Sequence, residues 1–460
     1  MKIFVNNIYS TLKTEDLDIL KAFGKKYSCK LPGYQYTPQY KSGWWKGDKQ
    51  YFSSKTGKFG TGLLKFIQKD LDYIDRVYDI EDSRQTPPYN DFSIDGVSLR
   101  PYQETLVSEA LNLKTCIIQA PTGAGKTIVL ASLLKACEDM TGLVFFTKKQ
   151  LLHQTYEYLQ GVGIDCGIAF GEGVDIKPIT LCTVQSVAKV LDSHLESSDF
   201  IIFDEVHEFS KGKLTTKVVK SFPNASIRIG MTATPPTDKF AKLNVCSFLG
   251  PVVEEVTAED LINLNFLTKP TIRMIDLQEE NLDDFTTSSY LEVYQQMVVD
   301  NEERNEIISD IALAPKAKNT KVLILTNNLK HSENLHKLIP EAYRLEGSDS
   351  LDIRNKTVEK FRNSSKPSII IGTVIFQTGI DIPELTHLIN ARGLRSDIAT
   401  IQALGRTLRK HKNKEEVFIY DFIDKVPYLI GHSKKRIQSY KALGFEVEKY
   451  GTPKRKRTKN

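Results

Sequence analysis

The sequence predicts an α/β fold in which two consecutive parallel-sheet domains follow a small α+β domain. Two observations carry this prediction. From about residue 96 onward, short apolar runs alternate with segments of helical pattern, and the alternation begins again near residue 269. Strands that alternate with helices form parallel sheets covered on both faces. In addition, 460 residues are too many for one ordinary hydrophobic core, so several domains are expected.

The first predicted domain covers residues 1–95. This block is rich in aromatic residues and contains short strand-like runs, with helices expected over residues 14–23 and 61–73. It ends in the polar, proline-containing stretch "EDSRQTPPYNDFSIDG", which is typical of a linker. We therefore expect this block to precede the sheet domains as a separate small domain.

The two sheet domains are predicted to cover residues 96–268 and 269–460. Strands expected in the first are "TCIIQA", "GLVFFT", "DFIIFDE" and "IRIGMTAT". Strands expected in the second are "KVLILT", "SIIIGT", "THLINA" and "EVFIYDF". Such short apolar runs are typical of parallel strands buried on both faces. The stretch "FLTKP" between the two domains is the candidate hinge.

The composition argues against a membrane protein and against a disulfide-rich secreted protein. Hydrophobic residues make up 40% of the chain and charged residues 26%, and the mean hydropathy is -0.29. No apolar run reaches about 18 residues, and the start "MKIFVNNIYSTLKTEDL" lacks the pattern of a signal peptide. The six cysteines are scattered and form no CxxC pair that would suggest zinc. We therefore expect a soluble protein of a reducing cytoplasm.

The stretch "CIIQAPTGAGKT" is the strongest chemical signal in the chain. An apolar run leads into a glycine-rich loop, and the loop leads into the helical segment "IVLASLLKAC". In such a loop backbone N–H groups surround phosphates at a helix N-terminus, a lysine reaches the β- and γ-phosphates, and a hydroxyl binds Mg²⁺. We therefore predict a site for ATP and Mg²⁺ in which the loop residues are Thr122, Gly123, Gly125, Lys126 and Thr127.

Two acidic residues, Asp204 and Glu205, end the apolar run of "IIFDEVH". A carboxylate at the end of a parallel strand lies at the same sheet edge as the phosphate loop. Asp204 is therefore predicted to hold Mg²⁺, and Glu205 to orient and deprotonate the attacking water. A lone histidine is usually structural, but the position of His207 beside these acids suggests that it senses the state of the nucleotide.

Gln402, Arg406 and Arg409 recur four and three residues apart in "GLRSDIATIQALGRTLRK", on one face of an expected helix. Phosphoryl transfer needs cations for the charge that develops on the γ-phosphate. Taken without the other motifs, the segment reads as a solvated basic helix. Combined with them, it favours an arginine pair that a separate domain supplies to ATP.

Together these motifs resemble those of the superfamily 2 helicases and translocases, across roughly residues 97–425. In order, the matching segments are "LRPYQ", "APTGAGKT", "FTKKQLLHQ", "TVQSV", "DEVH", "TAT", "ILTNN", "IGTVIFQTGIDIP" and "QALGRTLR". The resemblance implies two RecA-like motor domains and a coupling role for His207, Thr232 and Thr234. The nucleotide-contacting roles that it implies fall on Arg100, Gln103, Lys126, Thr127, Asp204, Glu205, Gly379, Asp381, Gln402, Arg406 and Arg409.

The N-terminal block and the segments "YDFID" and "HSKKRIQSYKALGF" further resemble the phage UvsW-type recombination helicases, which are similar in activity to RecG. This resemblance implies a DNA helicase that reverses forks and migrates junctions in a bacterial or phage-infected cytoplasm. Two alternatives stay open. An RNA helicase can carry the same motor, and a nucleic-acid clamp or annealing protein could use ATP only as a switch.

The motor motifs also supply candidate contacts to nucleic acid, which is expected to be held mainly by its phosphates. These candidates are Thr147, Lys148, Thr183, Gln185, Thr326, Asn327 and Thr373. Three interpretations of the basic tail "PKRKRTKN" stay open: a solvated end, a phosphate-binding arm and a nuclear signal, of which the phage resemblance favours the first two.

Both tryptophans of the chain, Trp44 and Trp45, lie together in the basic stretch "GWWKGDKQYFSSKTGKF". Gly47 and Asp48 form a two-residue turn signal between aromatic runs, so a β-hairpin is predicted here.

Alternation along this hairpin divides its side chains between two faces. The face expected to contact DNA carries Trp44, Lys46, Lys49 and Tyr51, and the face expected to fill the core carries Trp45 and Phe52. Opposed lysines destabilise a hairpin, which favours a binding role for the first face. The alternative buries both tryptophans.

Overall fold

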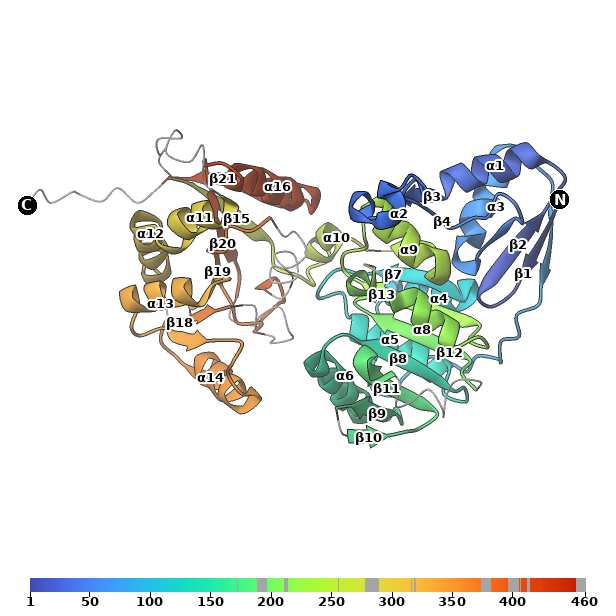
Figure 1. The fold of residues 1–460 in the computed structure, drawn as a ribbon. Helices are drawn as coiled ribbons and strands as arrows, with labels where there is room; N and C mark the ends of the chain where they lie inside the picture. Colours follow the sequence, from blue (N-terminus) through green and yellow to red (C-terminus); the bar gives the residue numbers. More distant parts are fainter. Residues whose placement is uncertain are drawn as a thin grey trace, which may run out of the picture. The chain divides into compact units, whose positions relative to one another are not determined.

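The computed structural model divides into two compact units, whose elements are drawn in Figure 1. Residues 1–121 and 125–256 form the first unit, and residues 122–124 and 257–460 form the second. The structure describes the whole chain except residues 172, 188–196, 211–213, 255, 278–288, 316, 318–319, 374–381, 396–404, 406, 412–413 and 452–460. None of the described helices is long and apolar enough to cross a membrane.

An eight-stranded sheet forms the centre of the first unit, with strand order β10-β9-β11-β8-β12-β13-β7-β14. All neighbouring strands are parallel except β9 and β10. The strands are β7 (Thr115–Gln119), β8 (Gly142–Phe146), β9 (Gly167–Phe170), β10 (Gly173–Asp175), β11 (Ile179–Thr183), β12 (Phe200–Asp204), β13 (Ile227–Thr232) and β14 (Val252–Glu254). The main helices are α4 (Pro101–Leu113), α5 (Lys126–Ala136), α6 (Lys149–Gly161), α8 (Leu214–Ser221) and α9 (Lys239–Leu249).

This sheet is buried because its strands carry apolar side chains on both faces. Every residue of β8 and β13 is buried, as expected for strands covered by helices on both sides. The rings of Phe145 and Phe203 stack with their centroids 5.2 Å apart inside the core cluster. The four strands predicted from apolar runs are confirmed as β7, β8, β12 and β13. The sequence analysis missed β9, β10 and β14, which have only three or four residues, and it also missed β11, which has five.

A seven-stranded parallel sheet forms the centre of the second unit, with strand order β17-β18-β16-β19-β20-β15-β21. The strands are β15 (Pro270–Asp276), β16 (Lys321–Leu325), β17 (Tyr343–Leu345), β18 (Ser368–Gly372), β19 (His387–Asn390), β20 (Val417–Ile423) and β21 (Glu446–Tyr450). The helices are α10 (Ala258–Asn263), α11 (Tyr290–Tyr294), α12 (Glu302–Leu313), α13 (Leu329–Leu338), α14 (Leu351–Asn363) and α16 (Leu429–Ala442), with a π-helix over Gln295–Val299. All four strands predicted here are confirmed as β16, β18, β19 and β20.

Buried charges attach α16 to β20 in the second unit. Asp421 accepts hydrogen bonds from Arg436 Nε at 2.9 Å and from the Tyr440 hydroxyl at 2.5 Å. The Arg436 guanidinium also donates to the carbonyl oxygens of Leu394 and Phe422. Breaking a buried pair of this kind leaves an uncompensated charge, which costs about 3–5 kcal/mol. The segments "YDFID" and "HSKKRIQSYKALGF" therefore contribute one structural network.

The N-terminal block has a sheet of its own, with strand order β5-β2-β1-β6. The strands are β1 (Lys2–Val5), β2 (Tyr9–Lys13), β5 (Lys58–Gly60) and β6 (Asp79–Asp82), and β3 (Ser28–Lys30) pairs separately with β4 (Asp48–Gln50). The helical segments are α1 (Leu17–Lys26), the 3₁₀ helices over Tyr34–Tyr36 and Thr61–Leu63, α2 (Pro38–Lys41) and α3 (Leu64–Tyr73). The two predicted helices are thus confirmed, with α1 shifted by three residues. A separate core cluster that includes Phe23, Phe52 and Phe59 supports the block.

The hairpin predicted around Gly47 and Asp48 was wrong. Strand β4 pairs antiparallel with β3, so that Asp48 lies opposite Lys30 and Gln50 opposite Ser28. Gly47 has a φ of +83°, and a Cβ there would lie 2.3 Å from the Tyr34 ring. The glycine therefore provides room for a packed ring instead of a two-residue turn.

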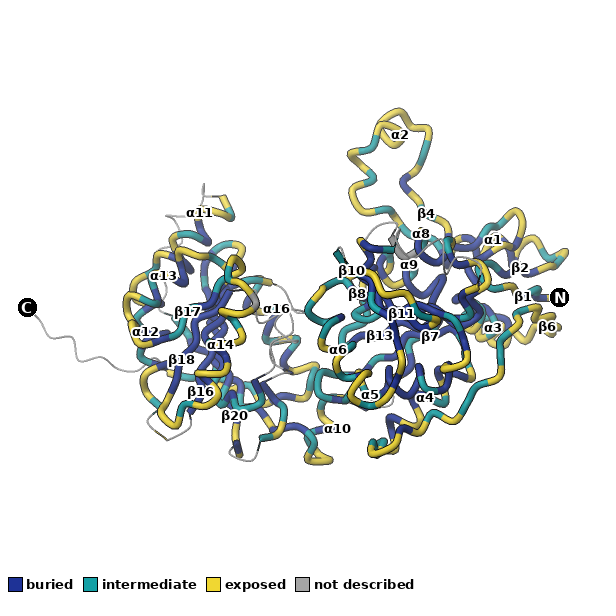
Figure 2. Tube along the Cα trace, turned by 90° about the horizontal axis from the view of Figure 1, so that it is seen from below, coloured by how far each residue is buried: buried dark blue, intermediate teal, exposed yellow. Residues whose placement is uncertain are grey.

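The segment between these two strands, which carries α2, is mostly exposed and projects from the body of the first unit (Figure 2). Trp44 is 88% exposed, whereas Trp45 is half-buried and donates from Nε1 to the Asp48 carbonyl at 3.0 Å. Phe52 lies in the core as predicted, but Tyr51 is buried as well. The predicted division of the two faces is therefore wrong for Tyr51 and for Trp45.

The N-terminal block rests directly on helix α9 of the large sheet domain. A Cβ at Gly62 would lie 2.2 Å from the carbonyl oxygen of Cys246, so the two backbones are in contact. Lys49 Nζ donates to Asn244 Oδ1 at 2.7 Å, and the Tyr51 hydroxyl lies 3.4 Å from the same oxygen. Asn244 in turn donates to the Ser210 carbonyl. The block and the first large sheet therefore form one body.

Candidate ATP site and nucleic-acid interface

The strand order of the first unit brings three of the predicted motifs to one edge of the sheet. Strands β12, β13 and β7 are neighbours and run parallel, so their carboxyl ends point the same way. The phosphate loop follows β7, Asp204 ends β12, and Thr232 ends β13. Ligands of open parallel sheets bind at this edge.

The predicted phosphate loop leads directly into a helix N-terminus, a position that favours phosphate binding. Gly125 has a φ of +83° and stands directly before α5, whose N-terminus begins at Lys126. A Cβ at Gly125 would lie 2.4 Å from Gln103 Nε2, so the buried Gln103 side chain lies against the loop. Gln103 Oε1 accepts from the Arg100 backbone N–H at 2.9 Å, which ties together two of the residues predicted to contact the nucleotide.

The Lys126 side chain lies over the carboxyl end of the sheet. Its Nζ is 3.7 Å from Glu205 Oε1 and donates to the Ala120 carbonyl at 3.4 Å. Both side chains are largely buried, so their charges interact in a medium less polar than water. The predicted phosphate-binding lysine and the predicted general base are therefore brought together.

The acidic pair at the end of β12 fits a divalent cation. Burial, followed by the charge of the adjacent Glu205, raises the pKa of Asp204 to about 7. Two neighbouring carboxylates in a buried position disfavour each other's charge, and a bound cation reverses that effect. Mg²⁺ prefers oxygen ligands and takes few of them from the protein, so the oxygen atoms of Asp204 and Thr127 have the chemistry that the predicted magnesium site needs.

A hydrogen-bonded chain links Glu205 to the end of β13. His207 Nδ1 lies 3.3 Å from Glu205 Oε2 and 2.9 Å from Thr232 Oγ1. The Thr232 hydroxyl lies 3.5 Å from Glu205 Oε2 and accepts from the Thr234 backbone N–H at 3.1 Å. The three residues predicted to couple hydrolysis to movement therefore form one network with the predicted general base.

Glu205 adopts a strained backbone conformation within this network. Its φ is +50°, in the left-handed region that residues other than glycine seldom occupy. Strain of this kind costs about 1–3 kcal/mol and persists only where surrounding contacts enforce it. The turn after β12 thus directs the Glu205 carboxylate toward both Lys126 and His207.

Predicted residues of the second unit are described only in part. Arg409 forms an isolated β-bridge with Leu267, and the Leu408 carbonyl accepts from the Thr268 N–H at 2.7 Å. The arginine motif is therefore attached to the "FLTKP" segment. Gly379, Asp381, Gln402 and Arg406 lie outside the described residues, as does the basic tail.

The candidate nucleic-acid contacts differ in how accessible they are. Gln185 and Asn327 are exposed, and Lys148 is half-buried and pairs with Glu208 at 2.9 Å. Sequence reasoning missed Glu208, although its position directly after His207 was a signal. The threonine candidates are more enclosed, and those that are buried are Thr183, Thr326 and Thr373. The Thr183 hydroxyl donates to Ser186 Oγ at 3.0 Å.

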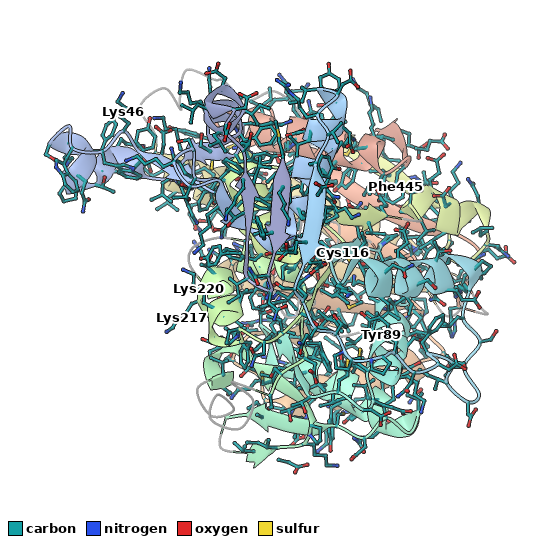
Figure 3. All side chains as sticks on the ribbon, turned by 90° about the vertical axis from the view of Figure 1, so that its right-hand side faces the viewer. Lys46, Tyr89, Cys116, Lys217, Lys220 and Phe445 are labelled. Atoms are coloured by element: carbon teal, nitrogen blue, oxygen red, sulfur yellow. The ribbon has the colours of Figure 1, made fainter. Side chains whose placement is uncertain are left out.

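Two of the N-terminal candidates do not face solvent as predicted. Tyr51 is buried against α9, and Lys49 lies over the rings of Tyr51 and Phe240 at 4.8 and 5.4 Å. Both side chains hold the N-terminal block to the sheet domain, so they are not free to contact DNA as a shared face. Trp44 and Lys46 remain exposed, and Figure 3 shows Lys46 on the projecting segment.

The fold, two family matches and the relatives described below indicate the class of the protein: a nucleic-acid-dependent ATPase of helicase superfamily 2. Residues 96–237 match the family described as "Type III restriction enzyme, res subunit", and residues 303–411 match "Helicase conserved C-terminal domain". The predicted fold of two RecA-like domains behind a small N-terminal α+β block is confirmed.

Individual relatives show which proteins of this class the chain is similar to. The "ATP-dependent DNA helicase uvsW" of Enterobacteria phage T4 is 23% identical, with 90% of this chain and 92% of that protein covered. The "DNA 3'-5' translocase XPB2" of Sulfurisphaera tokodaii is 25% identical, with 82% and 91% covered. A fragment of a putative HsdR subunit of a type I restriction enzyme from Vibrio vulnificus shares the fold, with a TM-score of 0.59, 16% identity, and 78% and 70% covered. The resemblance to UvsW-type helicases is therefore confirmed.

Proposed function

We propose that this protein is an ATP-dependent DNA helicase that remodels branched DNA by reversing forks and migrating junctions. The observation that carries the proposal is the extent of the similarity to the phage T4 helicase uvsW. Only 10% of the chain lies outside that match, whereas residues 1–95 make up about a fifth of it. The similarity therefore reaches into the N-terminal block.

In the proposed division of labour, residues 1–95 recognise the DNA structure, and residues 96–268 and 269–460 are the two motor domains. The block rests on α9 through backbone contacts and through the Lys49–Asn244 hydrogen bond. A recognition module held in this way keeps a fixed position relative to the first motor domain. The protein is proposed to act in the cytoplasm of a bacterium or of a phage-infected host.

Hydrolysis in this proposal follows from the side chains at the edge of the first sheet. The loop N–H groups and Lys126 bind the phosphates of ATP, and Glu205 takes the proton of the attacking water. Thr127 and Asp204 would hold Mg²⁺, which would supply charge neutralisation. Arg406 and Arg409 are proposed to stabilise the charge that develops on the transferred phosphoryl group.

Coupling in this proposal passes through the network of His207 and Thr232. A change at Glu205 that accompanies hydrolysis alters the hydrogen bonds at the end of β13, and with them the backbone of Thr234. The network thus connects the hydrolytic base to the segment that follows β13.

The test compares four substrates under ATP turnover: a replication fork, a four-way junction, a plain duplex with a single-stranded tail, and a matching RNA duplex. The expected result is rapid ATP-driven conversion of the fork and junction and slow unwinding of the two duplexes. Glu205→Gln serves as the control, because it keeps the fold and removes the base. Preferential unwinding of the RNA duplex would support the RNA helicase alternative, and conversion without hydrolysis would support an ATP-switched annealing protein.

A further inference from the structure

A basic hollow lies where the N-terminal block meets helices α8 and α9. Its volume is about 1010 Å³, and residues of β4 and β5 line it together with residues of both helices. Among its lining residues four are lysines and none is acidic: Lys49, Lys58, Lys217 and Lys220. Figure 3 shows Lys217 and Lys220 together on one helix, at the same edge of the molecule. All the charged residues that line the hollow are therefore positive.

Two of these lysines converge on a single ring from different parts of the first unit. Lys58 Nζ, from the N-terminal sheet, lies 4.3 Å from the centroid of Tyr9. Lys220 Nζ, from α8, lies 5.7 Å from the same centroid. Neither ammonium group has a carboxylate partner within the part of the chain that the structure describes. Contact with an aromatic face offsets only part of the repulsion between two like charges, so an anion is favoured between them.

A hydroxyl group in the wall of the hollow supports a phosphate ligand. Thr216 Oγ1 is buried and has no hydrogen-bond partner among the described residues. Buried hydroxyls normally have a partner, and this one can donate to a phosphate oxygen. A second hollow of about 450 Å³ shares Tyr9 and Lys58 with the first, so the two hollows adjoin at this ring.

We infer that this hollow binds the phosphate backbone of a duplex arm of the DNA substrate, an inference that rests on the proposed function. Sites for single strands expose aromatic faces on which bases stack. Here the rings of Tyr9 and Tyr51 are covered by ammonium groups at 4.3 and 4.8 Å. A surface that offers cations but no free ring faces suits a duplex, whose bases are turned inward and whose phosphates are outside.

The site holds its duplex arm at a fixed place on the first motor domain. The lysines come from both sides of the contact between the N-terminal block and the sheet domain, and that contact is made by backbone atoms at Gly62 and Cys246. An arm bound here stays with this domain while the motor acts on another strand. A branched substrate, which has more than one duplex arm, gains affinity from this second contact.

The experiment measures binding of the full-length protein to a plain duplex and to a fork, at several salt concentrations, by fluorescence anisotropy. The double variant K58Q/K220Q removes both charges near Tyr9. We expect its affinity for both DNAs to fall roughly tenfold and its salt slope to become shallower by about two, because each phosphate contact contributes about 0.9 to the slope. The control K25Q/K69Q removes the same charge from exposed lysines of α1 and α3, outside the hollow, and should bind as the wild type does.

Two results would overturn the inference. One is wild-type affinity and salt slope for K58Q/K220Q, and the other is an equal loss in the two double variants. The proposed function is judged separately, because it fails if the wild-type protein does not convert forks, whatever the binding slopes are. ATP hydrolysis stimulated by single-stranded DNA should be unchanged in K58Q/K220Q, which confirms that the variant is folded.

Discussion

The edge of the first large sheet and the projecting segment of the N-terminal block differ in how far the fold fixes the positions of their side chains. At the sheet edge, Glu205 and Thr232 stand directly beyond or at the end of a buried parallel strand, and Lys126 begins the helix that follows β7 and its loop. Their positions follow from strand order, and they meet within hydrogen-bonding or ion-pair distance. In the projecting segment, Trp44 is 88% exposed and its surroundings are short turns and one helix of four residues.

This difference shows which sequence patterns determine geometry. A glycine-rich loop between a buried strand and a helix has few possible conformations, so the motif alone predicts where its lysine lies. A glycine beside an aspartate allows several conformations. In this chain Gly47 makes room for the Tyr34 ring. Asp48 begins strand β4 and lies opposite Lys30, which is eighteen residues earlier in strand β3.

The largest expected effect tests the sheet edge. Lys126→Ala should lower DNA-stimulated ATP hydrolysis by at least about 10²-fold, because the lysine is the phosphate-binding cation of the loop. DNA binding should be retained, since the side chain faces Glu205 and the Ala120 carbonyl. Release of inorganic phosphate measures the first property, and anisotropy measures the second.

The matched control for this prediction is Lys337→Ala, which removes an exposed lysine at the end of α13. It should hydrolyse ATP at the wild-type rate. If the Lys126 variant did the same, the assignment of the ATP site to this sheet edge would be wrong.

The second prediction compares a buried and a half-buried aromatic side chain of the N-terminal block. Phe52→Ala should destabilise the block by about 3–5 kcal/mol, because the ring is fully buried and stacks on Phe59 with centroids 5.8 Å apart. Trp45→Ala should cost only about 1 kcal/mol, since that side chain is half-buried and makes one hydrogen bond, to the Asp48 carbonyl. Hydrogen exchange over residues 1–80 in the full-length protein measures both losses.

Equal loss of exchange protection in the two variants would show that Trp45 contributes to the core as much as Phe52 does, as the sequence analysis expected. Loss in neither would mean that the block is held mainly by its contact with α9.

The physical reason for these successes and failures lies in the range of the interactions. The eight strands read from apolar runs, and the positions of Lys126, Asp204 and Glu205, depend on patterns within a few residues of one another. The pairing of β3 with β4 and the burial of Tyr51 against Asn244 depend on residues far apart in the chain. No pattern near Tyr51 signals that α9 will cover it, so the sequence alone could not predict that this ring is unavailable to DNA.

The third prediction tests the network that connects the base to β13. Thr232→Val keeps the shape of the side chain and removes the hydroxyl that meets His207, Glu205 and the Thr234 N–H. Loss of a buried hydrogen-bonding group costs about 1–3 kcal/mol. We expect this cost to fall on the coupling step, so that the number of forks converted per ATP drops by about tenfold or more. ATP hydrolysis should drop by less than about tenfold, because the base Glu205 and Lys126 are retained.

The measured quantity is the ratio of fork conversion to phosphate release in the same reaction. Thr105→Val, which removes an exposed hydroxyl on α4, is the matched control and should leave the ratio unchanged. An unchanged ratio for Thr232→Val would place coupling elsewhere, and a proportional fall of both rates would make Thr232 part of the hydrolytic machinery alone.

The smallest expected effect belongs to the projecting segment. Trp44→Ala should weaken fork binding by about five- to tenfold, because a base that stacks on an exposed aromatic ring contributes about 1–3 kcal/mol. Stability should not change, since the side chain is 88% exposed. Tyr73→Ala is the matched control, because Tyr73 is also 88% exposed on the same block but stands at the end of α3, away from the basic stretch. If both variants bind forks as the wild type does, the projecting segment does not bind DNA. If both variants are equally weakened, the exposure of an aromatic ring on this block matters more for binding than its position beside Lys46.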